Sequence, residues 1–147
     1  MKISAKGRYG LSAMIYLAQF ATENCATVLK VSEDLGISKV YLEQVFALLK
    51  KSNLVFSIKG SSGGYQLSHS PEKITAFDIL NAIEITLFEP TEAITAKNSS
   101  CVDHALQSLL WDELDNTVKH FLSTITLSEL LVEAQKNQQG KDFMYFI

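Results

Sequence analysis

The sequence contains little that would break helices or cross a membrane. Only two prolines and seven glycines interrupt its 147 residues, a composition that favours long helices. No apolar run approaches the roughly 20 residues that a membrane-spanning helix needs. The start, Met1–Ser4, lacks the continuous apolar stretch of a secretory signal peptide. We therefore expect a cytoplasmic protein.

Cysteine is equally scarce, with one residue in each half of the chain, Cys25 and Cys101. In a reducing compartment two such residues are expected to be thiols or metal ligands rather than a structural disulfide.

Charge is distributed unevenly along the chain. Residues 1–70 carry a formal charge of +4, whereas residues 71–147 carry −7, for a net charge of −3. This asymmetry predicts a half that faces a polyanion and a half that is kept away from it, although two solvated surfaces would give the same counts. The apolar fraction of 47% suffices for a core, and the length fits one domain or a compact domain with an extension.

The first half shows the periodicity of three helices. Apolar residues recur at intervals of three and four over about 7–21, and again over Val28–Leu35, where Gly36 provides a terminating residue. Ser38 is a suitable N-cap for a third helix that reaches about Lys51. Two helices joined by a short turn with glycine indicate a helix-turn-helix.

A hairpin is predicted directly after the third helix. Strand-like segments at about 54–58 and 65–68 flank a glycine-rich tip at 59–64. The tip is not a phosphate-binding loop, because no Gly-Lys-Ser/Thr is present and no helix follows it. A hairpin in this position is a wing, so the sequence predicts a winged helix-turn-helix.

Three helix-start signals divide the second half. Thr75, Ser100 and Thr126 are each followed three residues later by an acidic residue. The middle helix, about 101–122, would be on the order of 33 Å long, longer than a small domain needs for its own core. We expect it to pair with the same helix of a second subunit, although it could also fold back on its own domain. The predicted fold is mainly α with a small β-hairpin wing and a long dimerisation helix.

Several segments together carry a family resemblance. They are Met1–Gly10, Gly36–Ser38 with Tyr41–Gln44, Ile58–Gly60 with Gly63–Tyr65, Cys101–Leu106 and Ile125–Leu130. In these segments the chain resembles the Rrf-type winged-helix transcriptional regulators, which include IscR, NsrR and CymR, with a mixture of IscR-like and CymR-like features. The resemblance implies a homodimeric regulator of a palindromic operator, a repressor that responds to redox, cysteine or iron–sulfur status. It divides the chain into a winged helix-turn-helix domain (1–84), a sensor-type loop (85–100), and a dimerisation helix with a C-terminal extension (101–147).

The chemistry of DNA recognition assigns residues to each part of the winged helix-turn-helix, which we call the reader. The second helix of the motif should enter the major groove and present Ser38, Lys39, Tyr41, Glu43 and Gln44, although Tyr41 could instead be a core residue. Gln44 can bond a base edge and Glu43 can accept from a cytosine amino group; the resemblance makes Glu43 a specificity residue. Lys59 is expected at the minor groove, with Gly60, Gly63 and Gly64 permitting close backbone approach. The remaining expected contacts are to phosphates, from Lys2, Lys6 and Arg8, although any one of these cations could simply be solvated.

The residues expected for signal sensing are less complete than those expected for DNA binding. The resemblance implies three cluster cysteines before the long helix and, in the IscR branch, a histidine after the last one. Only Cys101 and His104 match, whereas a cluster normally needs four ligands. We expect no cofactor unless Glu89, Glu92 or a second subunit completes an iron–sulfur site; otherwise Cys101 packs near the helix start and His104 bonds locally. Cys25 resembles the reactive cysteine of the CymR branch and is a redox-sensing candidate, the alternative being a small buried thiol.

Two further expectations concern partners and activity. The apolar end Phe143–Ile147 resembles that of CymR-type repressors, whose partner is a cysteine synthase, although it could also pack on its own dimer. An enzyme with Cys101, Asp103 and His104 as a nucleophile set is not expected, because neighbours on one helix do not converge on one substrate. The alternative to a DNA-binding regulator is a winged-helix interaction module that has lost DNA binding and acts through a protein partner.

Overall fold

The first helix, α1 (Ala5–Phe20), supplies much of the core of the N-terminal half. Ser4 is its N-cap and accepts a hydrogen bond from the Gly7 N–H at 3.1 Å, so the helix begins two residues earlier than the apolar periodicity predicted. Ala13, Met14 and Leu17 on its inner face are fully buried. The computed structural model describes residues 2–92 and 100–145, with side chains through Gly140.

The helix-turn-helix forms as predicted. Helix α2 (Val28–Leu35) is capped by Thr27 and ends at Gly36, whose φ of 66° is left-handed, a conformation that suits glycine. Helix α3 (Lys39–Lys51) follows after a turn of three residues, Gly36–Ser38. The hairpin of β1 (Val55–Ile58) and β2 (Gly64–Leu67) is antiparallel, with Val55 opposite Leu67 and Ile58 opposite Gly64. The fold is thus mainly helical with a two-stranded wing.

Helix α4 (Ala76–Ile83) covers α1 and α3 after a short 3₁₀ turn, η1 (Pro71–Lys73). The predicted capping box is present, because Thr75 Oγ1 accepts from the Asp78 N–H at 3.1 Å and Asp78 Oδ2 accepts from the Thr75 N–H at 2.9 Å. Gly10 allows the close approach of α1 and α4, since a Cβ there would overlap the end of Ile83.

The predicted long helix is one continuous rod with an irregular middle. It comprises α5 (Ser100–Leu106), a π-helical turn η3 (Gln107–Trp111) and α6 (Asp112–Thr124). The Asp112 N–H bonds the Gln107 carbonyl, five residues back. The apolar pattern did not reveal this inserted residue, because a π turn changes the phase of the stripe without interrupting it.

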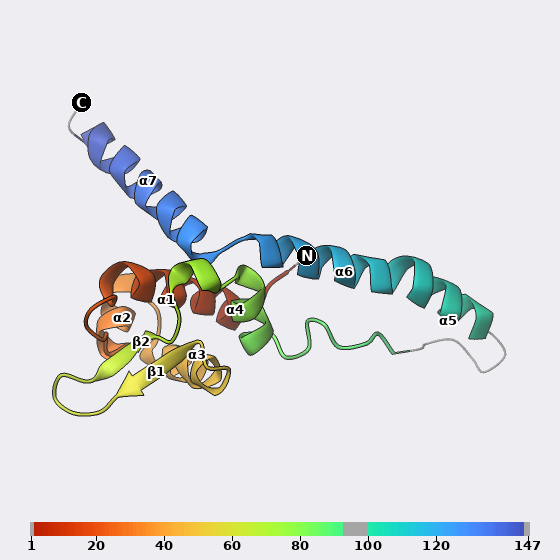
Figure 1. Cartoon of the computed structure of the whole chain (residues 1–147), viewed down its shortest axis with the longest axis horizontal. Coiled ribbons are helices and arrows are strands. Elements are labelled where there is room, and N and C mark those ends of the chain that lie inside the picture. The colour runs from red at the N-terminus through yellow and green to blue at the C-terminus, as the bar shows by residue number, and fades with distance from the viewer. Residues whose placement is uncertain (1, 93–99, 146–147) are drawn as a thin grey trace.

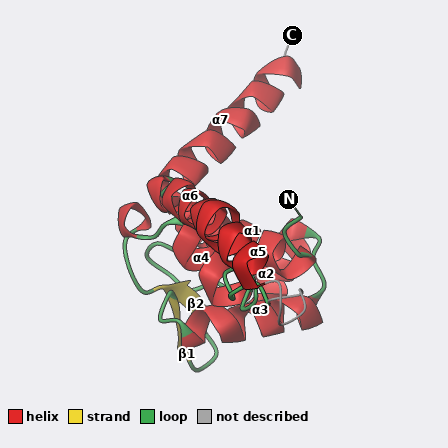
Figure 2. Ribbon diagram, turned by 90° about the vertical axis from the view of Figure 1, so that its right-hand side faces the viewer, coloured by secondary structure: helices red, strands yellow, loops and turns green. Residues whose placement is uncertain are grey.

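Helix α7 (Leu127–Tyr145) begins at a second capping box, in which Glu129 and Thr126 exchange bonds at 2.8 and 3.1 Å. Backbone bonds between the Ile74–Ala76 segment and the Ile125–Leu127 segment, both 2.8 Å, tie the start of α7 to the head. Figure 1 shows the result: a head of α1–α4 and the hairpin, from which the α5–α6 rod and α7 project in different directions. Figure 2 views the molecule along the rod. None of the described helices is both long and apolar enough to cross a bilayer.

Candidate nucleic-acid interface

Helix α3 has one buried face and one exposed face. Leu42, Val45, Phe46 and Leu49 are completely buried and anchor the helix in the head. All five residues predicted to read DNA are exposed at the start of the helix, and so is the apolar Val40, which is 63% exposed. The five are Ser38, Lys39, Tyr41, Glu43 and Gln44. The 3.6-residue period therefore separates the anchoring residues from the candidate contacts.

The start of α3 retains unused hydrogen-bonding capacity. Ser38 occupies the N-cap position, but its side chain makes no capping bond. Ser38 is exposed at the positive end of the helix, an arrangement suited to a phosphate. Lys39 and Glu43 lie 3.7 Å apart and are each about half exposed, so water weakens this ion pair and leaves both side chains free to exchange partners.

Tyr41 is supported by a residue that the sequence analysis did not select. Its ring makes an edge contact with Tyr9 of α1, with centroids 6.0 Å apart and planes at 63°. The contact positions a side chain that remains 47% exposed. Tyr9 lies within the apolar periodicity that predicted the first helix, and no sequence signal linked it to Tyr41.

The wing is joined to α3 at its base and has a glycine tip. Lys50 Nζ donates to Ser57 Oγ at 2.8 Å, and the rings of Phe46 and Tyr65 stack 4.5 Å apart. Lys59 is exposed at the tip. Beside it, Gly60 adopts a φ of 114°, which a side chain would strain. A Cβ on Gly63 would collide with backbone atoms of Ile58 and Gly60, so both glycines are needed for this shape.

Cys25 lies against this wing. Its thiol donates to the carbonyl oxygen of Ser62 at 2.9 Å, and the next residue, Ala26, pairs with Tyr65 through bonds of 2.9 and 2.7 Å. Gly64 allows the two backbones to approach, because a Cβ there would collide with Ala26. The loop before α2 therefore pairs with β2 as a third, bridge-paired segment of the wing. Cys25 is half-buried where it contacts the hairpin tip.

The basic start of α1 adds the last candidate contacts. Lys2 and Arg8 are exposed, and Lys6 is half-buried. The Tyr9–Tyr41 contact brings this end of α1 close to the start of α3.

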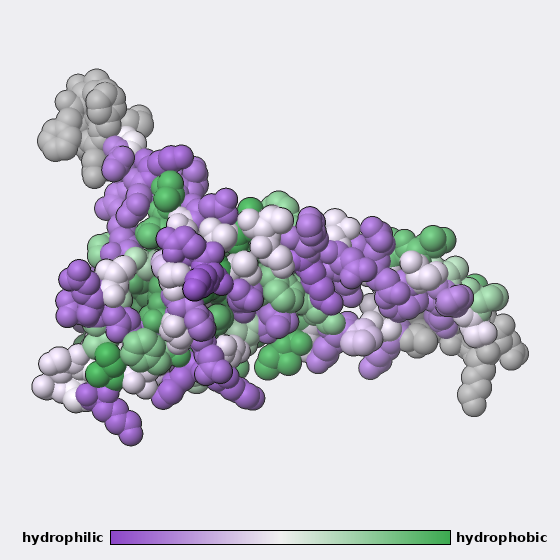
Figure 3. Space-filling view, in the orientation of Figure 1, coloured by the Kyte–Doolittle hydropathy of each residue, from purple (hydrophilic) through white to green (hydrophobic). Residues whose placement is uncertain are grey.

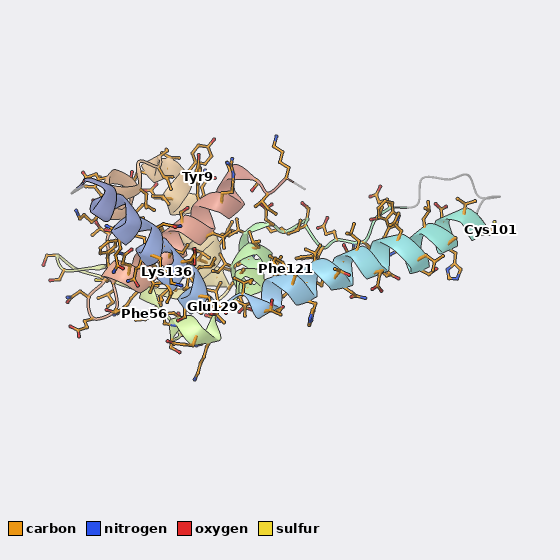
Figure 4. The ribbon with its side chains drawn as sticks, turned by 90° about the horizontal axis from the view of Figure 1, so that it is seen from above. Tyr9, Phe56, Cys101, Phe121, Glu129 and Lys136 are labelled. Carbon is orange, nitrogen blue, oxygen red and sulfur yellow. The ribbon has the colours of Figure 1, made fainter. Side chains whose placement is uncertain are left out.

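The candidate cluster residues lie far from the reader. Figure 4 shows Cys101 at the free end of the rod, opposite the end of the molecule that carries Phe56 of the wing. Cys101 and His104 are both exposed. His104 lines a shallow hollow with Glu92 and four other residues, Thr91, Asp103, Gln107 and Trp111.

This donor set does not fit an iron–sulfur cluster. Among the described residues no three His, Cys, Asp or Glu side chains come together in a metal-binding group. Residues 93–99 contain none of these four residue types, and the described part of the chain brings together fewer than the four ligands that a cluster requires. Glu89 and Glu92 do not complete such a set.

The predicted tail contact lies outside the residues whose side chains the structure describes. Helix α7 extends to Tyr145, but Phe146 and Ile147 lie outside the described residues, as do the side chains from Lys141 onward. Binding of a cysteine synthase to Phe143–Ile147 stays a prediction of the resemblance. A pull-down of that enzyme by the full chain and by a chain truncated after Asp142 would test it.

Comparison with known proteins identifies the class to which this arrangement belongs. A family model described as "Rrf2: Iron-dependent Transcriptional regulator" matches residues 3–133. The chain is 34% identical over 138 residues to the HTH-type transcriptional regulator IscR of Aliivibrio salmonicida, covering 94% of this chain and 82% of that one.

Two solved structures agree in sequence and in fold. CymR (YrzC), titled the global cysteine regulator of B. subtilis, is 34% identical with a TM-score of 0.72, covering 90% of this chain and 98% of that one. T. potens IscR is 32% identical with a TM-score of 0.72, covering 99% and 96%. The chain belongs to the Rrf2 family. It is a transcriptional regulator with the winged-helix fold of CymR and IscR, and this family consists of regulators rather than enzymes.

Proposed function

We propose that this regulator binds double-stranded operator DNA as a homodimer, with α3 in the major groove and the wing at the adjacent minor groove. The observation that carries the proposal is the exposed and mostly polar first half of α3, which is held by four buried residues and placed beside a lysine-tipped hairpin. A helix presented in this way fits the major groove. Gln44 and Glu43 read base edges, while Ser38, Lys39 and the start of α1 bind phosphates.

Dimerisation supplies the symmetry of a palindromic site. The rod carries large apolar side chains that its own head does not cover, of which Leu109 is 81% exposed and Phe121 62%. Figure 3 shows apolar residues interspersed with polar ones along the rod. Burying them against the same helix of a second copy places two α3 helices in one twofold assembly. Such a dimer on an operator within a promoter would exclude polymerase, so we infer repression.

The controlling signal in this proposal is the oxidation state of Cys25. The thiol–carbonyl bond to Ser62 supports this choice, because oxidation to a sulfenic acid replaces the S–H donor with a bulkier S–OH group and so inserts an oxygen atom where the thiol contacts the carbonyl. The incomplete donor set around Cys101 and His104 supports Cys25 over a cluster.

Binding to DNA duplexes selected from a randomised pool tests the proposal. Fluorescence anisotropy is measured over a range of salt concentrations. Gln44→Ala should lose about 1–3 kcal/mol of discrimination at one base position in each half-site. Lys59→Ala should weaken binding to all duplexes and reduce the salt slope by about 1. Lys136→Ala, an exposed lysine on α7 outside the proposed interface, is the matched control and should bind as the unmodified chain.

Salt-independent binding, or unchanged binding by both reader variants, would contradict the assignment. Failure to select any duplex would favour an interaction module that has lost DNA binding.

A further inference from the structure

The first turn of α1 contains only half of a capping box. Ser4, the N-cap, accepts from the N–H of residue N3 at 3.1 Å. In a complete box the N3 side chain is Glu or Gln and bonds back to the N-cap N–H. Here N3 is Gly7, which has no side chain, and the first turn contains no acidic residue.

Glu84 supplies the missing acceptor from the other end of the domain. Its Oε1 accepts from the Ser4 N–H at 2.9 Å, across 80 positions of sequence. Glycine at position 7 makes room for it, because a Cβ there would overlap the Glu84 carboxylate and come within 2.7 Å of Ile3 Cγ2. Gly7 and Glu84 therefore form one unit, a capping box completed between helices.

The backbone of Glu84 is held on both sides. Its N–H bonds the Leu80 carbonyl at 2.7 Å as α4 ends, and its carbonyl accepts from the Leu87 N–H at 3.0 Å. The carboxylate therefore extends from a well-held position toward the start of α1.

We propose that Glu84 is a positioning residue for DNA binding, which holds the basic start of α1 in its binding geometry. The inference rests on the proposed function, in which Lys2, Lys6 and Arg8 contact phosphates. Lys6 and Arg8 lie at the positive end of the α1 dipole, where cations are unfavourable and a carboxylate is favourable. Without Glu84 the first turn is free to fray, and DNA must then order it on binding.

Glu84 also links the reader to the rest of the molecule. It is the joint between α4 and the segment 85–92, and α4 packs on both α1 and α6.

The sign of one measurement distinguishes positioning from simple electrostatics. Removing a negative charge near DNA should tighten binding if charge alone matters. Loss of positioning should weaken it, and for Glu84→Ala we expect about fivefold to tenfold weaker operator binding, comparable to the loss of a helix cap. Glu84→Gln keeps an acceptor for the Ser4 N–H and removes the charge, so it should bind at least as tightly as the unmodified chain.

Gly7→Ala tests the same contact without altering the carboxylate. It should displace Glu84 and weaken binding by a similar factor while leaving the melting temperature nearly unchanged, because alanine favours the helix. The double variant should bind no more weakly than either single one, since both remove one interaction. Hydrogen exchange at the Ser4 amide should accelerate in both single variants. Glu89→Ala, an exposed glutamate in the neighbouring segment, is the control and should leave affinity and exchange unchanged.

The outcomes separate this inference from the proposed function. If the unmodified chain binds DNA with the expected salt dependence but Glu84→Ala binds equally or more tightly, the positioning role is wrong and the proposed function stands. If the unmodified chain selects no DNA, both are wrong. Should Glu84→Ala fail to fold, Gly7→Ala and Glu84→Gln decide: equal affinity in these two variants overturns the inference.

Discussion

At the scale of single residues, the described side chain with the most strongly shifted pKa lies behind the proposed DNA contacts and is not one of them. Tyr16 is only 5% exposed, and its hydroxyl donates to Asp34 Oδ2 at 2.6 Å. Burial, and then the bond and charge of Asp34, raise the pKa of Tyr16 to about 12. The hydroxyl bond, together with Lys30 at 3.0 Å, lowers the pKa of Asp34. The pair joins α1 to α2, so it stabilises the first half of the helix-turn-helix.

Tyr16→Phe should lower the free energy of unfolding at neutral pH by about 1 kcal/mol, typical of one hydrogen bond. The raised pKa means that the Tyr16 contribution is complete below about pH 10 and is lost as pH rises toward about 12. The lowered pKa of Asp34 means that its contribution is present above about pH 4 and is lost on further acidification. Denaturant unfolding across pH should show both losses in the unmodified chain.

Alkaline titration by tyrosinate absorbance provides the control for this prediction. Of the five tyrosines, the one that ionises near pH 12 should be absent from Tyr16→Phe. A titration curve that keeps this late component in the variant would show that the perturbed tyrosine is a different one.

At the scale of elements, the wing is a three-part structure and not an isolated hairpin. A two-stranded hairpin alone is only marginally stable in water. Here the loop backbone at Ala26 pairs with Tyr65, and the Gln66 side chain donates to the Thr22 carbonyl at 3.0 Å. The Cys25 thiol donates to the Ser62 carbonyl at the hairpin tip. The position of Lys59 therefore depends on the loop before α2.

Oxidation of Cys25 should move the wing without unfolding the head. Peroxide transfers one oxygen atom to the thiolate, giving a sulfenic acid, and its other oxygen leaves as water. We expect about tenfold weaker operator binding, equivalent to about 1.4 kcal/mol, with recovery after thiol treatment. Cys25→Ser should bind DNA and resist peroxide, whereas Cys101→Ser, at the remote end of the rod, should respond like the unmodified chain. A peroxide response that persists in Cys25→Ser would assign the sensor elsewhere.

At the scale of the whole molecule, the rod projects from the head and exposes large apolar side chains. No described residue from Ser100 to Thr124 is fully buried, although the rod includes Leu109, Leu110, Leu114 and Phe121. Leu109 and Leu114 are five residues apart and would diverge on a regular α-helix. The π turn, with its bond from Asp112 to Gln107, brings them closer to one face.

Leu109→Glu should therefore convert a dimer into monomers, because a charge placed in an apolar twofold contact is buried twice. Sedimentation velocity measures the change directly. Affinity for a palindromic duplex should fall much more than affinity for a single half-site. Asn116→Glu adds the same charge at an exposed polar position of α6 and serves as the control. An unmodified chain that sediments as a monomer at micromolar concentration would remove the basis for this prediction.

Features that depend on residues close in sequence were predictable, whereas contacts between side chains distant in sequence were not. The boxes at Thr75 and Thr126 and the left-handed Gly36 were predictable, because each depends on residues within one or two turns. The wing was predictable from its turn residues and its position after α3. The contacts of Tyr9 and Glu84 were not, since each joins side chains from elements whose packing angle no short pattern specifies.

By itself, the sequence determined the elements, their order and the polar face of α3, because periodicity and capping act over a few residues. Only the tertiary structure decided that Glu84 completes the cap of α1 and that Cys25 touches the wing. Both features depend on how side chains distant in sequence meet in space. The free energies of these contacts depend on the packing of the whole folded molecule and not on any one segment of the chain.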